Sequence, residues 1–164
     1  MAMSATELAN ELKAMPLFDN EADAAQAWAE AFGNYFEGDG STHGAESNSV
    51  YVASALMATA KLAMQGSLAG MSSPGQGAAK IQAGIQSFWS ILVALPASAW
   101  ATVTVITPPA SLSGLAAALQ PVFDNNRDSE LSKDDAMTAI ANAIHANNQG
   151  GSATWSGPTV LPIT

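Results

Sequence analysis

The stretch VFDNNRDSELSKDD, from Val122 to Asp135, carries the side chains of this sequence that are best suited to hold a metal ion. Five of its fourteen residues are acidic, and amide and hydroxyl side chains lie between them. Such oxygens are ligands for hard cations such as calcium. The same residue types are also common in solvated turns between two helices. The stretch therefore predicts either a metal-binding loop or a capped turn.

Twelve residues of this stretch, Asp124 to Asp135, resemble the calcium loop of an EF-hand. Apolar residues precede them, and the amphipathic segment AMTAIANAIH follows. The resemblance covers residues 115–146 and implies a helix–loop–helix unit that binds Ca²⁺. The ligands that it implies are Asp124, Asn126, Asp128, Glu130 (through its backbone carbonyl), Ser132 and Asp135.

Two positions depart from the EF-hand pattern. Ser129 stands where the family has a glycine in a left-handed turn, and Asp135 stands where it has a longer glutamate. Both changes imply weak affinity, about 10⁻⁴ M or poorer, or a magnesium-like site. The alternative interpretation is a capping box, in which Ser132 caps the next helix and the acids favour its N-terminus.

No other segment carries a comparable chemical signal. His43 and His145 lie far apart without metalloprotease spacing, and we interpret them as a solvated loop residue and a helix C-terminal residue. No serine stands in a nucleophile elbow, and no glycine run has the order of a phosphate loop. The absence of cysteine excludes thiolate metal sites and cysteine nucleophiles. The sequence thus predicts a non-enzymatic protein.

Charge is distributed very unevenly along the 164 residues. The net charge of −9, with only five basic residues, argues against nucleic acid as a partner. Residues 1–46 form an acidic part with a net charge of −8, whereas residues 81–123 carry no charge at all. A surface built from that uncharged segment would be poorly solvated, so we expect other chains to cover it.

Hydrophobic periodicity and helix caps predict a mainly α fold, a helical domain over residues 1–150. Ser4 and Asn20 are expected N-caps, and Pro16 and Pro96 are expected to end helices. The predicted helices cover residues 4–15, 20–36, 49–68, 78–95, 114–123 and 133–146.

Two segments have the composition of strands. Residues 100–107 are rich in β-branched side chains, and the extended tail, residues 151–164, contains a second such stretch at 153–163. We expect the two stretches to pair in a minor sheet. Pro158 and Pro162 restrict any strand of the tail to the edge of that sheet.

Residues 88–106 are nineteen residues without a charge, about the length that spans a bilayer. Pro96 interrupts them, no basic cluster flanks them, and their periodicity changes part-way. A buried helix followed by a strand is therefore expected rather than a membrane span. The N-terminus lacks the basic and apolar regions of a secretory signal.

The apolar end of the tail suggests contact with other chains, because a monomer covers such a segment poorly. The expected interface residues are Trp155, Val160, Leu161 and Ile163. The chain also resembles the small alanine- and glycine-rich structural proteins of tailed-phage virions, through its short predicted helices and the ending AIHANNQGGSATWSGPTV. That resemblance implies a head, neck or tail component whose partners are its own copies and neighbouring structural proteins. A calcium-binding helical module and a small membrane protein are the alternatives.

Overall fold

The computed structural model describes residues 3–37, 54–70, 74–94, 103–127, 130–155 and 160–163. Six α-helices among these residues confirm the mainly α fold. In chain order the elements are α1 (Ala5–Ala14), α2 (Glu21–Glu37), α3 (Ser54–Leu68), the 3₁₀ turn η1 (Pro74–Gln76), α4 (Gly77–Ala94), β1 (Val103–Thr107), the 3₁₀ turn η2 (Ala110–Gly114), α6 (Leu115–Arg127), α7 (Lys133–Asn148), β2 (Gly151–Trp155) and β3 (Val160–Ile163).

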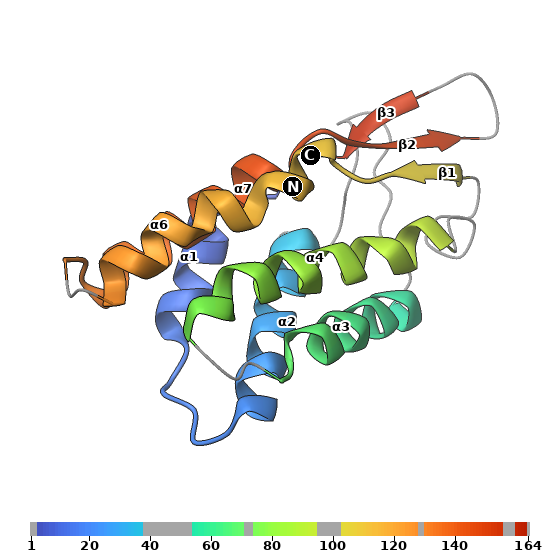
Figure 1. Ribbon diagram of the computed structural model, residues 1–164. Helices are drawn as coiled ribbons and strands as arrows, with labels where there is room; N and C mark the ends of the chain where they lie inside the picture. Colours follow the sequence, from blue (N-terminus) through green and yellow to red (C-terminus); the bar gives the residue numbers. More distant parts are fainter. Residues whose placement is uncertain are drawn as a thin grey trace.

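Helix α4 lies in the middle of the helical body, between α3 and α6 (Figure 1). Helix α1 packs against α7, and α2 packs against both α1 and α3. A Cβ atom at Gly84 would lie only 3.1 Å from Leu68 Cγ, so the glycine allows α3 to approach α4 closely. The sheet lies at one end of this body, beyond the C-terminal half of α4 (Figure 1).

The predicted caps of the first two helices are confirmed. The Glu7 amide donates to Ser4 Oγ at 3.4 Å, and the Asp23 amide donates to Asn20 Oδ1 at 2.9 Å. Each bond satisfies a backbone donor that the first turn of a helix leaves without an intrahelical partner. Helix α1 ends at Ala14, two residues before Pro16, as predicted.

The helix predicted over residues 114–123 is α6, and its predicted end at Phe123 is wrong, because α6 continues to Arg127. Gln120 Nε2 donates to Asp124 Oδ1 at 3.1 Å across one helical turn, which supports the extension. The Glu130 amide then donates to the Asn125 carbonyl at 3.0 Å. A hydrogen bond from the amide of one residue to the carbonyl five residues earlier is typical of the C-terminal end of a helix.

Other helix bounds agree with the prediction to within about two residues, as is usual for helix ends. Helix α4 begins one residue earlier than predicted, and α7 runs two residues further, to Asn148. The predicted start of the third helix, at residues 49–53, lies outside the described residues.

The three strands form an antiparallel sheet in the order β1-β2-β3. Val105 pairs with Thr154, and Thr154 pairs with Val160, so these three residues form one row across the sheet. The predicted pairing of residues 100–107 with the tail is thereby confirmed, although residues 100–102 and 156–159 lie outside the described part. Pro162 belongs to β3, an edge strand, as its missing N–H requires. The prediction that any strand of the tail lies at an edge is wrong for β2, which contains no proline and is the central strand.

The segment from residue 88 to residue 106 contains a helix end and a strand. Helix α4 ends at Ala94 and β1 begins at Val103. Within the described ranges, no helix has both the length and the apolar character needed to cross a bilayer.

Aromatic side chains of α2 and α4 fill the centre of the core. The rings of Phe32 and Phe88 lie 5.0 Å apart and nearly perpendicular, as do those of Phe36 and Trp89 at 5.2 Å. Edge-to-face contacts of this kind are favourable beyond the area that they bury. Much of the uncharged segment is therefore the core of this chain itself, since Ile85, Phe88 and Trp89 are buried.

A buried hydrogen bond joins the middle of the chain to its end. Trp89 Nε1 donates to Asn148 Oδ1 at 2.7 Å, and Asn148 is fully buried. The Asn148 amide also donates to Met3 Sδ at 3.2 Å. At the six-membered ring of the same indole, a Cβ atom at Gly151 would lie 2.9 Å from Trp89 Cη2, so a glycine is needed where β2 begins.

We predict that Asn148→Ala lowers the free energy of unfolding by about 1–3 kcal/mol, because it leaves the buried Trp89 N–H without a partner. Asn142→Ala is the matched control, since it removes the same side chain from an exposed position of the same helix. Urea unfolding measures both variants. Equal, small losses for the two would show that the buried bond contributes nothing to stability.

Candidate functional site

The residues predicted to bind calcium are distributed over a helix end, a turn and a helix start. Asp124 and Asn126 belong to the last turn of α6 rather than to a loop. Glu130 and Ser132 lie in the turn, and Asp135 lies in the first turn of α7. Asp128 and Ser129 lie outside the described residues.

Ser132 caps helix α7 in the way that the capping-box alternative predicts. The Asp135 amide donates to Ser132 Oγ at 3.1 Å, and Ser132 Oγ donates to Asp135 Oδ2 at 2.7 Å. Asp134 and Asp135 lie in the first helical turn, where the helix dipole favours negative charge. The capped start of this helix is thus confirmed.

Calcium binding at the turn stays a prediction. Two of the expected ligands already accept hydrogen bonds, Asp124 from Gln120 and Asp135 from Ser132. Among the side chains that the structure describes, no three histidine or acidic groups gather closely enough to hold a metal ion. That absence does not extend to the carboxylate of Asp128, which lies outside the described residues.

Lys133 has a role that the sequence did not indicate. Its Nζ donates to the carbonyls of Lys13, at 3.1 Å, and Met15, at 2.9 Å. The last carbonyls of a helix have no intrahelical donors, so a lysine that donates to them satisfies these acceptors. Its positive charge also interacts favourably with the negative end of the helix dipole. The start of α7 thereby fixes the end of α1, 118 to 120 residues away along the chain.

His145 lies in the last turn of α7, as predicted, but it also contacts α2. Its Nδ1 lies 2.9 Å from the Tyr35 hydroxyl, and its Nε2 lies 2.8 Å from Gln149 Nε2. Burial lowers the pKa of His145 and raises the pKa of Tyr35. Both shifts favour the neutral forms of the two side chains, between which this hydrogen bond can form.

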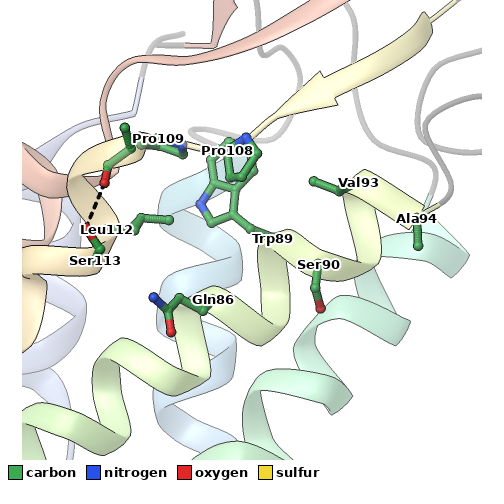
Figure 2. A pocket seen from close by; sticks show the side chains of 10 residues that line it. Gln86, Trp89, Ser90, Val93, Ala94, Pro108, Pro109, Leu112 and Ser113 are labelled. Carbon is green, nitrogen blue, oxygen red and sulfur yellow. Dashed lines mark hydrogen bonds between the residues drawn. The ribbon is translucent and has the colours of Figure 1, made fainter.

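A groove lies between α4 and the segment that follows β1 (Figure 2). Its volume is about 420 Å³, within the range of ~300–1,000 Å³ usual for ligand pockets. Trp89 and Leu112 line its inner part, and Val93, Pro108 and Pro109 line its sides. We call it the Trp89 groove.

No charged side chain lines the Trp89 groove, and its polar groups are few. The hydroxyls of Ser90 and Ser113 donate to the carbonyls of Ser87 and Ala110, so they offer only acceptor lone pairs to a bound group. One turn before Gln86, Gln82 accepts a hydrogen bond from the Ala116 amide, whereas Gln86 is exposed at the rim of the groove. The groove can bind an uncharged apolar group, and none of its residues is suited to transfer a proton.

The predicted interface residues of the tail lie in the hairpin β2–β3, Trp155 in the central strand β2 and the other three in the edge strand β3. Trp155 pairs with Val103, Leu161 with Ala153, and Ile163 with Gly151. The side chains of Trp155, Leu161 and Ile163 lie outside the described part of the structure. Val160 is 58% exposed.

Comparison of the chain with protein-family models, with curated protein sequences and with solved structures finds no match.

If the acidic turn binds calcium, millimolar calcium raises the melting temperature by mass action, and Asp124→Ala abolishes that increase. Ser129→Gly strengthens the site because glycine accepts the left-handed turn of an EF-hand loop. Ser132→Ala lowers stability by about 1 kcal/mol with or without calcium, since it removes the helix cap. Calorimetry in calcium and in chelator decides: identical melting temperatures contradict the metal site.

The lowered pKa of His145 makes stability dependent on pH. The unfolded chain takes up a proton near pH 6.5, whereas the folded chain resists it, so this contribution is complete above about pH 6.5 and is lost as pH falls below it. Urea unfolding at about pH 7.5 and 5.5 should show a larger loss for the wild type than for His145→Gln, which stays neutral. The same loss in both proteins would contradict the assignment.

Proposed function

We propose that this chain is a non-enzymatic structural subunit that assembles through its sheet. The observation that supports the proposal most directly is the row formed by Val105, Thr154 and Val160. Residues directly opposite one another in a sheet project from the same face. Val105 is 51% exposed and Val160 is 58% exposed, so two valines stand together on one open face.

The adjacent row of the same face contains Thr107 and Ser152, which pair with each other, because side chains alternate between faces with a period of two. The strands β1, β2 and β3 contain no charged residue. Surfaces of monomeric proteins carry interspersed charges that oppose association. A neutral, threonine- and valine-bearing face therefore favours packing against a matching sheet, about 10 Å away.

The face, rather than the edge, is the surface that favours association. Pro162 in β3 has no N–H to offer to an added strand, and proline is one of the devices that protect sheet edges from pairing. Among the described residues, the acidic side chains concentrate in α1, in α2 and around the start of α7, whereas the sheet has none, so repulsion between copies is small at the sheet. Two copies with a net charge of −9 approach most easily through a neutral surface.

The assembly that we propose is the virion of a tailed phage, as a head, neck or tail component. The support is the alanine- and glycine-rich composition, the short helices, of which α4 with 18 residues is the longest described, and the extended glycine-, threonine- and proline-containing tail. The partners are then further copies and neighbouring structural proteins. Mass spectrometry of purified particles should detect the chain as a stoichiometric component.

The double variant Val105→Lys/Val160→Lys should weaken self-association, because it places like charges on the proposed contact face of both copies. Its fold should persist, since both positions are more than half exposed. Leu62→Lys is the matched control: Leu62 is 67% exposed on α3, outside the sheet. Light scattering after size-exclusion chromatography measures the mass. Association of the double variant at the wild-type level would refute the sheet as the assembly surface.

A further inference from the structure

Leu17 is the most exposed large hydrophobic side chain among the residues described, at 96%. It lies in the coil Met15–Phe18 that joins α1 to α2, which we call the Leu17 loop. Pro16 is exposed beside it, whereas Met15 and Phe18 are half-buried and anchor the two ends. The loop thus presents one apolar side chain away from the body of the protein.

A side chain of helix α7 holds the start of the Leu17 loop in place. Lys133 Nζ donates to the carbonyl of Met15 at 2.9 Å and to that of Lys13 at 3.1 Å. Pro16 removes one backbone degree of freedom next to Leu17 by fixing its own φ angle. A constrained apolar loop loses less conformational entropy on binding than a free one, so it is suited to contact a partner.

The Trp89 groove offers an apolar surface that could cover the exposed Leu17 side chain. It is uncharged, about 420 Å³ in volume and lined mainly by apolar side chains. Gln86 at its rim carries a primary amide, which can both donate to and accept from the backbone of an extended segment. Asp19 and Glu21, which follow the loop, would meet no negative charge there, because residues 81–123 carry none.

The loop and the groove lie on different parts of the molecule. The loop is where α1 leads into α2, away from the C-terminal half of α4 and the segment after β1 that line the groove (Figure 1). We propose that the Leu17 loop of one copy binds in the Trp89 groove of a second copy. This inference rests on the proposed function and adds a second, separate contact to the one on the sheet. A head-to-tail contact of this kind repeats from copy to copy and produces a ring or an open filament.

The absence of cysteine from the sequence allows a direct test by disulfide formation. Two single variants, Leu17→Cys and Ser90→Cys, are prepared separately, mixed and oxidised, so that a covalent heterodimer forms only between copies. Ser90 is exposed and lines the groove, so its replacement leaves the core intact. The matched control mixes Leu62→Cys, 67% exposed on α3, with Ser90→Cys.

We expect several-fold more heterodimer from the Leu17→Cys mixture than from the Leu62→Cys mixture. Leu17→Asp should also weaken self-association roughly tenfold or more, since it places a carboxylate where leucine would be buried in the proposed contact. The melting temperature should stay unchanged, because Leu17 is exposed within one copy. Equal yields from the two mixtures overturn the loop-in-groove contact.

The sheet variants separate this result from the proposed function. If Val105→Lys/Val160→Lys abolishes association while the Leu17 pair gives no excess heterodimer, the structural role stands and the loop contact is refuted. If the Leu17 pair cross-links in excess although the sheet variant associates normally, the loop contact stands and the sheet is refuted as the assembly surface.

Discussion

The hydrogen bond from Trp89 to Asn148 is the interaction on which the rest of the structure depends. It joins the central helix α4 to the end of α7 within the core, at 2.7 Å and without access to water. Because Asn148 also binds Met3, the start of the chain is fixed at the same point. The indole then leaves room only for Gly151 where β2 begins, so the same side chain determines where the tail enters the sheet. An unpartnered polar group at this depth would cost more than the bond itself contributes.

The parts of the fold that sequence reasoning predicted are those with local causes. Ser4, Asn20 and Ser132 cap their helices because each precedes a backbone amide that its own side chain can reach, and β-branched alternation was sufficient to pair β1 with the tail. The extension of α6 was missed because a side-chain pair and a closing bond from Glu130 outweigh the low helix propensity of aspartate and asparagine. The partners of Lys133 were missed because they lie more than a hundred residues away. Local pattern carries no signal for such contacts.

The uncharged segment from residue 81 to residue 123 has two physical explanations. One is internal, since α4 is surrounded by α3, α6 and the aromatic residues of α2 and contributes much of the core. The other concerns the side chains that remain exposed around it, Val93 at 40% and Val105 at 51%, together with Val160 on the neighbouring strand. From sequence alone the two explanations are indistinguishable, because both remove charge. The exposed valines, on the sheet and at the rim of the Trp89 groove, are what argue for contacts between copies.

Sedimentation of the wild-type protein over a range of concentrations and salt is the most direct measurement of this account. Contacts through uncharged surfaces between copies of net charge −9 should strengthen as salt screens their repulsion, so the association constant should rise from about 0.05 to 0.5 M ionic strength. A chain that stays monomeric at every concentration would contradict an assembly role. Association that weakens with salt would contradict it equally, because it would show that ion pairs, rather than the neutral sheet and groove, hold the copies together.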